Sequence, residues 1–376
     1  MTNKYILYGA EFSLYSGKAR AYLRYKKIAF DEVLSTMAVY RKIIMPQTGV
    51  KFIPVVKTPD NRYLQDTTNI IDQLELMHPS RAVYPTTPKQ KLVSLLLELY
   101  GDEWLLIPAM HYRWNYNNFP FIFQEFGKII NPRLPAFIRG FLGKKIGGRF
   151  RDIVPLLGLT KKTIPEIEKW YEQSFLVDFN HHLSKYPFLL GDIPCIGDFG
   201  LFGPLYAHLY RDPYPAKLMK EIAPNVADWV ERLQDASLVE GEFLKNDEIP
   251  ETLLPLLINL FNVQWPILAD TADKLHDWTT NKLRDEPSGD PLTCPRRLGM
   301  HEFNFLGIKE QRLVLPHSQW MMQRPLNYYQ SLSNQNKSEM NTFLISINGF
   351  EALQNPLKSE FSRKNNKFVV NIKKPN

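Results

Sequence analysis

The segment from Lys4 to Glu75 constrains the fold of this chain most strongly, because short apolar runs and helical patterns alternate in it in a definite order. It opens with the strand-forming run 5–8, and a polar turn leads directly into a helical pattern that ends near Lys27. The later elements are a strand at 30–34, a helical piece at 39–44, strands on either side of a turn at 59–62, and a helix from residue 67. This order predicts an α/β domain.

Two short motifs within this segment point to a known family. Ile53-Pro54 precedes the third strand, and the acid–hydroxyl pair Asp66-Thr67 opens the last helix. Together with the order of elements, they resemble the thioredoxin-like N-terminal domain of the glutathione S-transferase family. The stretch 101–114 in turn resembles a bacterial-type subset of transferase-like proteins.

The resemblance divides the 376 residues into three parts. It implies a thioredoxin-like, glutathione-binding α/β domain at residues 1–85 and an all-α substrate domain at residues 86–245. Residues 246–376 lie beyond the standard fold, and their patterns predict an α+β extension of helices and strands. The extension contains no known catalytic motif. We expect it either to cap the substrate pocket or to build a dimer interface.

The resemblance implies that glutathione is the co-substrate. In the family, the backbone beside the proline pairs with the cysteinyl amide of glutathione, and the acid–hydroxyl pair holds its γ-glutamyl end. The residues expected to bind it are Ile53, Pro54, Gln65, Asp66 and Thr67. Independently of the family, free N–H groups and the positive dipole end of a helix favour a carboxylate. A plain helix cap at Thr67 and an ordinary proline at the start of an edge strand are the structural alternatives.

Ser13 and Ser16 stand where the first strand turns into the first helix. They resemble the Cys-x-x-Cys pair of thioredoxins with hydroxyls in place of thiols, which excludes a dithiol oxidoreductase. A thiol with a pKa of about 8.5 is mostly protonated at neutral pH. A hydroxyl donor beside a helix N-terminus favours the thiolate, which is the nucleophile. The resemblance to serine-type transferases therefore implies catalysis by Ser13 first and Ser16 second. Tyr8 is a third candidate, and simple capping by the serines is the alternative.

A helical pattern in the second part of the chain carries the candidate pocket for the other substrate. In the family, this helix faces the glutathione site and lines the pocket for an apolar electrophile. The resemblance places five side chains there, namely Trp104, Met110, His111, Arg113 and Trp114. Packing in the core, with a solvated arginine, is an equally good interpretation of the same residues.

Residues 119–148 form an unusual segment that mixes phenylalanines with lysines and arginines. We expect a helical insertion packed over the substrate pocket, and contact with a membrane surface is the weaker expectation. The net charge of the chain is +7, but its basic residues are dispersed, which gives nucleic-acid binding little support.

The two cysteines, Cys195 and Cys294, lie far apart and match neither a disulfide framework nor a metal motif. We therefore expect no metal site and a reducing, cytoplasmic environment. No run of about 18 apolar residues suggests a membrane span. The expected partners are glutathione, a small hydrophobic electrophile and a second copy of the chain.

Two functions fit these observations. The first is a glutathione transferase that activates the thiol for attack on an apolar electrophile. The second is a transferase-like binding or scaffold protein that keeps the fold with little or no catalysis, which the long extension and the segment 119–148 favour.

Overall fold

A computed structural model of the chain describes residues 4–285 and 291–371. Its first part is the predicted α/β domain, in the predicted order of elements. The order is β1 (Tyr5–Gly9), α1 (Leu14–Tyr25), β2 (Phe30–Leu34), α2 (Met37–Val39), η1 (Tyr40–Ile44), α3 (Met45–Thr48), β3 (Val55–Lys57), β4 (Tyr63–Gln65) and α4 (Thr67–Met77). The sheet order is β2-β1-β3-β4, with β1 and β2 parallel and the other pairs antiparallel. This is a thioredoxin-like arrangement, so the predicted fold class is confirmed.

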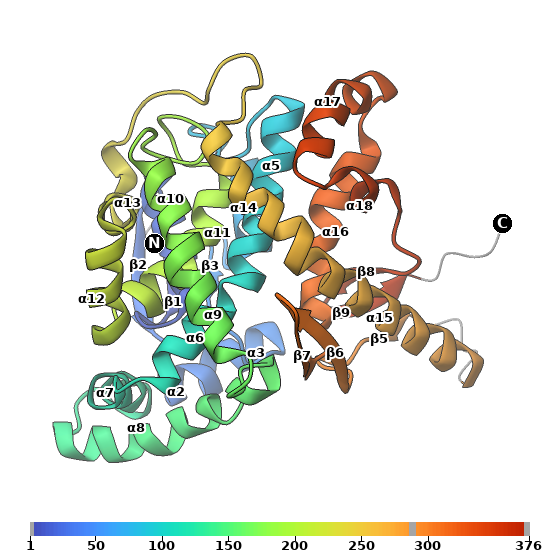
Figure 1. Cartoon of the computed structure of the whole chain (residues 1–376). Helices are drawn as coiled ribbons and strands as arrows, with labels where there is room; N and C mark the ends of the chain where they lie inside the picture. The colour runs from blue at the N-terminus through green and yellow to red at the C-terminus, as the bar shows by residue number, and fades with distance from the viewer. Residues whose placement is uncertain (1–3, 286–290, 372–376) are drawn as a thin grey trace.

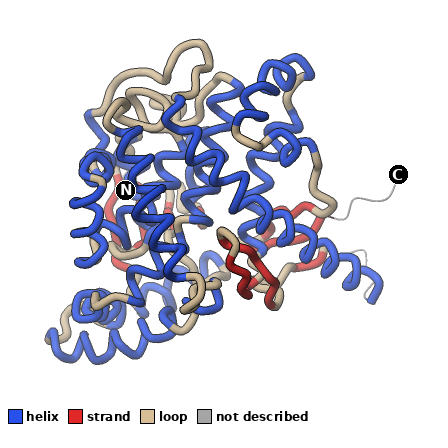
Figure 2. The backbone as a smooth tube through the Cα atoms, in the orientation of Figure 1, coloured by secondary structure: helices blue, strands red, loops and turns tan. Residues whose placement is uncertain are grey.

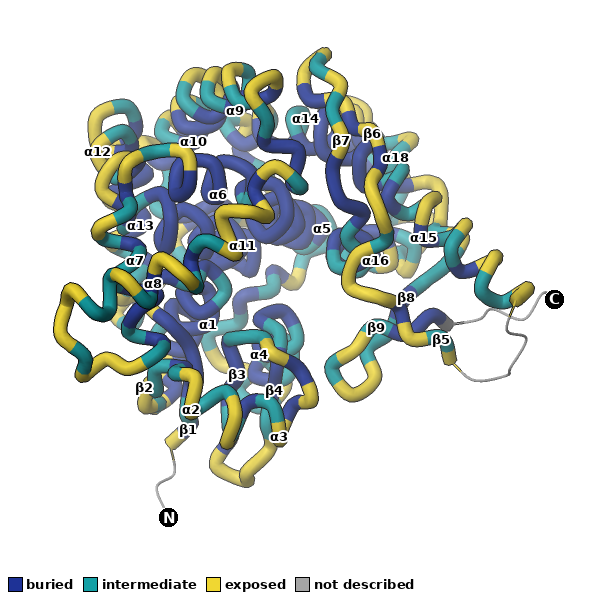
Figure 3. Tube along the Cα trace, turned by 90° about the horizontal axis from the view of Figure 1, so that it is seen from below, coloured by how far each residue is buried: buried dark blue, intermediate teal, exposed yellow. Residues whose placement is uncertain are grey.

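The second part is the predicted helical body. One nearly continuous helical run at its centre comprises α5 (Pro88–Leu99), η2 (Tyr100–Trp104) and α6 (Leu106–Asn115). The remaining elements are α9 (Ile164–Trp170), η4 (Tyr171–Phe175), α10 (Leu176–Leu183), α11 (Ile196–Pro204), η5 (Leu205–Tyr210), α12 (Pro213–Ile222), α13 (Pro224–Gln234) and the short turns η3 (Val154–Leu157) and η6 (Ala236–Leu238). Figure 3 shows α5 and α11 buried in the middle of the molecule.

Gly101 explains how closely two of these helices approach each other. A Cβ atom added to Gly101 would lie 2.3 Å from the carbonyl carbon of Gly200 in α11. Only glycine leaves room for this contact between backbones, because any side chain would force the helices apart. Helix α11 also packs against α1, and Asp102 of η2 pairs with Lys18 of α1 next to the candidate site.

The segment rich in phenylalanine and basic residues forms a helical hairpin, α7 (Phe119–Ile130) and α8 (Ala136–Arg151), at the edge of the molecule (Figure 1). The expected helical character is therefore confirmed. Phe126 of α7 packs against Phe12 and Trp114, which ties the hairpin to the body. The outer face of α8 is exposed.

The extension begins with a long helical run of η7 (Glu251–Leu253), α14 (Leu254–Asn259), η8 (Leu260–Gln264) and α15 (Trp265–Asp285). It continues with β5 (Leu292–Thr293), β6 (Met300–Phe305), β7 (Ile308–Leu313), α16 (Pro316–Ser331), α17 (Asn334–Ser346), α18 (Phe350–Gln354), β8 (Glu360–Lys364) and β9 (Lys367–Asn371). The strands form two small sheets, seen in red beside the helices in Figure 2. The expected mixture of helices and strands is confirmed.

The extension packs tightly on the rest of the chain. Helix α16 lies against α5, and buried side chains from all three parts belong to one hydrophobic core (Figure 1). By length and composition alone, the run from Glu251 to Asp285 could cross a membrane, although the sequence patterns did not suggest it. Of its most apolar stretch, 56% is buried against other parts of the protein, and a core helix passes the same test.

Candidate functional site

The N-terminus of α4 is the first component of the candidate site. The Oδ1 atom of Asp66 accepts hydrogen bonds from the backbone N–H groups of Thr68 at 3.1 Å and Asn69 at 3.4 Å. The predicted cap at Thr67 is therefore wrong by one residue, because the carboxylate of Asp66 reaches two free N–H groups and suits the positive end of the helix. Asp66 has a φ of 78°, which is costly for a residue with a side chain. Such strained residues cluster at functional sites.

The second component is the turn before β3. The Ile53–Pro54 peptide bond is cis. The preceding residue, Phe52, is covered by the extension, because the guanidinium carbon of Arg296 lies 3.0 Å from the centre of its ring. Nearby, the side-chain amide of Asn366 donates a hydrogen bond to the carbonyl oxygen of Thr48 at 3.0 Å. The extension thus contacts the chain at two positions shortly before the cis bond.

The extension also binds the α4 end of the site directly. The Nε2 atom of His317 lies 3.3 Å from Oδ2 of Asp66, and its Nδ1 atom lies 2.7 Å from Oε1 of Glu103. Arg363 donates from Nη2 to Oε1 of Gln65 at 2.6 Å and from Nη1 to the carbonyl oxygen of Gln65 at 3.0 Å. Two cationic side chains of the extension therefore hold the residues that the resemblance assigns to the γ-glutamyl end of glutathione.

His317 and Asp66 each shift the pKa of the other toward its charged form. Burial alone would lower the pKa of His317, but the carboxylates of Glu103 and Asp66 outweigh it and raise the pKa to about 10. Burial likewise opposes ionisation of Asp66, yet the hydrogen bond and charge of His317, with help from Arg363, lower the pKa of Asp66 to about 2. At neutral pH, the site therefore contains an imidazolium between two carboxylates.

A buried network of charges lies next to this site and fastens the extension to the core. Lys18 of α1, with no exposed surface, donates to Oε1 of Glu98 at 2.8 Å and also pairs with Asp102. Arg324 of α16 donates to Oε2 of Glu98 at 3.2 Å and to Oδ2 of Asp72 at 2.7 Å. Removing the extension would leave the buried carboxylate of Glu98 without its arginine, so the extension is an integral part of the fold.

The three candidate catalytic hydroxyls differ in exposure. Ser13 is half-buried, and its Oγ atom caps α1 by accepting from the backbone N–H of Ser16 at 3.3 Å. Ser16 is fully buried, and its Oγ atom accepts from the backbone N–H of Ala10 at 3.2 Å. Tyr8 is buried against Ile44 and Val55. Ser13 is thus the accessible hydroxyl of the three, and its catalytic role stays a prediction.

The five residues predicted to line the electrophile pocket lie in the interior. Trp104 stacks on Phe305 of β6, with ring centres 5.6 Å apart. The other four are also buried. Arg113 donates from Nε to Asp212 at 2.7 Å and from Nη1 to the carbonyl oxygen of Phe12 at 2.9 Å. His111 lies 2.8 Å from Oε1 of Glu168. A role for these side chains in substrate binding stays a prediction, and it requires them to move.

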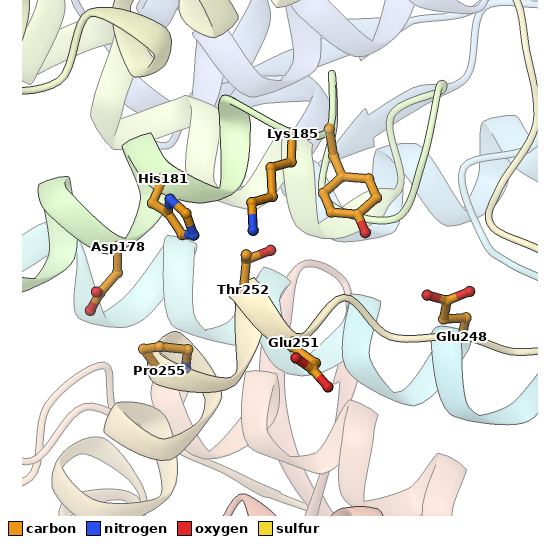
Figure 4. A pocket seen from close by; sticks show the side chains of 8 residues that line it. Asp178, His181, Lys185, Glu248, Glu251, Thr252 and Pro255 are labelled. Atoms are coloured by element: carbon orange, nitrogen blue, oxygen red, sulfur yellow. The ribbon is translucent and has the colours of Figure 1, made fainter.

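A cavity among the described residues lies away from this site. It has a volume of about 490 Å³ and opens between α10 and the start of the extension. Figure 4 shows the polar side chains around it, namely Asp178, His181, Lys185, Glu248, Glu251 and Thr252. The described part of the chain contains no group of three or more side chains suited to hold a metal ion.

Sequence reasoning did not identify His317, Arg324 or Arg363 as residues of the site. Their partners lie at least 214 positions away in the chain, and no local motif connects them. The one available signal is that His317 follows a proline at the start of a helix, which is too common to indicate a site.

A comparison with known protein families agrees with the topology of the N-terminal domain. Residues 7–82 match the family model described as glutathione S-transferase, N-terminal domain. No curated protein sequence matches the chain. A similar solved structure, a glutathione S-transferase from Rhodospirillum rubrum F11, is 14% identical with a TM-score of 0.40, over 66% of this chain and 96% of that one. A glutathione S-transferase from Methylobacterium radiotolerans, in complex with glutathione sulfonate, is 18% identical with a TM-score of 0.38. The match covers 66% of this chain and 100% of that one. The tau-class glutathione S-transferase from mango is 18% identical with a TM-score of 0.40. The match covers 68% of this chain and 96% of that one.

Proposed function

We infer that the chain belongs to the glutathione S-transferase family through its N-terminal domain, of which residues 7–82 match the family model, and we propose that its own C-terminal extension takes the place that this family gives to glutathione. The observation that carries the proposal is the double contact of His317 with Asp66 and of Arg363 with Gln65. In this closed state, the protein acts as a transferase-like binding or assembly module with little or no thiol transfer.

The chemistry of the contacts supports this substitution. The γ-glutamyl end of glutathione carries an amine and a carboxylate, so an acidic side chain such as Asp66 would receive the amine. The imidazolium of His317 is a cation at that same carboxylate, and the guanidinium of Arg363 lies 4.0 Å from its other oxygen. Glutathione must therefore displace one or both cations before its amine reaches Asp66.

A second candidate function is glutathione transfer after the extension has moved, and the half-buried hydroxyl of Ser13 at the N-terminus of α1 favours it. The hydroxyl would donate a hydrogen bond to the glutathione sulfur, and the thiol proton would pass to solvent. The thiolate would then form a carbon–sulfur bond with an apolar electrophile, whose leaving group departs with the electron pair. Glutathione as co-substrate, a homodimer and a cytoplasmic location belong to this candidate as proposals.

Calorimetry with glutathione tests the proposal. We expect no measurable heat from the full chain at millimolar glutathione, and saturable binding by the double variant His317→Ala/Arg363→Ala. The matched control is Arg62→Ala, which removes an exposed arginine that pairs with Asp60 and contacts Met77, and this variant should behave as the unaltered chain does. Micromolar binding by the unaltered chain would contradict the proposal. A folded double variant that still shows no binding of glutathione would mean that the site does not bind this ligand.

A generic aryl halide assay on the same proteins separates the two candidate functions. Turnover that appears in the double variant and depends on glutathione would support the transferase candidate. Binding without turnover would support the binding module.

A further inference from the structure

The basic residues are spread along the sequence as described above, but the excess of positive over negative charge falls in one short segment. From Phe126 to Arg151 there are seven lysines and arginines and no aspartate or glutamate. The net charge of the whole chain is also +7, so positive and negative charges cancel in the rest of the chain. Nearly all of this segment belongs to the hairpin of α7 and α8 (Figure 1).

The packing of the hairpin determines which face of α8 looks outward. Glycines form the inner face of α8, because a Cβ atom at Gly143 would lie 1.8 Å from the carbonyl oxygen of Phe123 in α7. On the outer face, Phe137 is 77% exposed and Phe141 is 75% exposed. Lys145 and Arg149 continue the same row at a spacing of four residues, and both are exposed. The outer row of α8 is thus two phenyl rings followed by two cations.

Four cations in this row and next to it have no polar partner among the described residues. In the described residues, the side chains of Arg133, Lys144, Lys145 and Arg149 make no hydrogen bond or ion pair that would hold them. By contrast, Lys128 pairs with Glu125, and Arg139 donates to the carbonyl oxygen of Pro132. Four unpaired cations near two exposed phenyl rings form a surface that is complementary to an anionic, partly apolar partner.

We propose that α8 docks on the surface of a bilayer that contains anionic phospholipids. Phe137 and Phe141 enter the boundary between headgroups and acyl chains, while Lys144, Lys145 and Arg149 contact the headgroup phosphates. This is the arrangement of an interfacial amphipathic helix, in which buried apolar area and attraction to anionic lipid act together.

The shape of the face favours a bilayer over a nucleic acid. Proteins that bind single strands use a basic groove with stacking rings along it, whereas the exposed cations and rings of α8 lie along one side of a single helix. The two exposed phenyl rings continue the row of Lys145 and Arg149, and a phosphate backbone bound to these cations would leave the rings in water. A bilayer removes the rings from water and meets the cations with phosphates at the same depth.

Co-sedimentation of the full chain with lipid vesicles tests the proposal. We expect binding to vesicles that contain phosphatidylserine, weak or no binding to vesicles of phosphatidylcholine alone, and loss of binding at high salt. Phe137→Ser/Phe141→Ser and Lys145→Glu/Arg149→Glu should each weaken binding by about tenfold or more. All four positions are exposed, so these variants should keep the fold, which circular dichroism checks.

Two control variants make the result specific to α8. Leu76→Ser/Leu238→Ser removes the most exposed leucines elsewhere, at 79% and 86% exposure, and Lys217→Glu reverses an exposed charge on α12. Both should bind vesicles as the unaltered chain does. No binding to phosphatidylserine vesicles, or equal binding by the α8 variants, would overturn the proposal. Tight binding of α8 to a nucleic acid oligomer without binding to vesicles would overturn it as well.

Discussion

The Nε2 atom of His317 lies 3.3 Å from the Oδ2 atom of Asp66, although 251 positions separate the two residues in the chain. Asp66 caps the helix that the resemblance assigns to the γ-glutamyl end of glutathione. His317 belongs to an extension that the standard fold lacks, and it is also bonded to Glu103. The contact therefore joins the candidate site to the part of the chain whose role the sequence leaves open.

The first prediction concerns pH. The pKa of His317 is raised to about 10 from an ordinary value of 6.5, so protonation of His317 stabilises the fold fully below about pH 6.5. This contribution declines as the pH rises and is lost above about pH 10. Ionisation of Asp66 contributes stability at the other end of the pH scale. Its pKa is lowered to about 2, so this contribution is present at neutral pH and is lost as the pH falls through that value.

Urea denaturation across pH measures this effect. The free energy of unfolding of the unaltered chain, minus that of His317→Gln, should be largest near pH 5 to 6 and shrink steadily towards pH 10. A difference that stays constant up to pH 9 would show that His317 is not held as an imidazolium.

The second prediction separates Ser13 from Ser16. In the double variant His317→Ala/Arg363→Ala, Ser13→Ala should lower glutathione-dependent turnover by about a hundredfold, as loss of a preorganised donor does. It should also cost about 1 kcal/mol of stability, because Ser13 caps α1. Ser16→Ala should chiefly cost stability, about 1–3 kcal/mol, since it leaves the buried N–H of Ala10 without a partner. Equal turnover in Ser13→Ala and its parent would remove Ser13 from the proposed mechanism.

The third prediction concerns Arg113. Its guanidinium is buried and donates to both carboxylate oxygens of Asp212. Arg113→Met should lower the free energy of unfolding by about 3–5 kcal/mol, because it leaves Asp212 as a buried, uncompensated charge. Arg62→Met, which breaks an exposed pair with Asp60, should change it by less than about 0.5 kcal/mol. Thermal denaturation of the two variants side by side gives the comparison, and similar stabilities would exclude the structural role of Arg113.

The fourth prediction uses two glycines. Gly101→Ala places a Cβ atom against the backbone of Gly200 and should cost about 3 kcal/mol, because neither helix can yield cheaply. Gly148→Ala meets no atom within 4 Å on α8 and should stabilise the protein by roughly 0.5–1 kcal/mol through helix propensity. A stable Gly101→Ala variant would contradict the close approach of η2 to α11 at Gly200.

The order of elements in the N-terminal domain was predictable because each element is encoded by nearby residues. The run before Gly9, the turn at Ser13 and the cap at Asp66 all act over a few positions. The contact between Arg363 and Gln65 was not predictable, since it spans 298 positions and depends on how an entire extension packs. The burial of Trp104 and Arg113 could not be decided for the same reason, because one helical pattern suits both a core and a pocket lining.

A double-mutant cycle between His317 and Asp66 tests the closure of the site most directly. Unfolding free energies of the unaltered chain, His317→Gln, Asp66→Asn and the double variant, all at pH 7, yield the coupling between the two side chains. We predict that the two residues stabilise each other by about 1–3 kcal/mol. A coupling indistinguishable from zero would contradict the claim that the extension holds this end of the site.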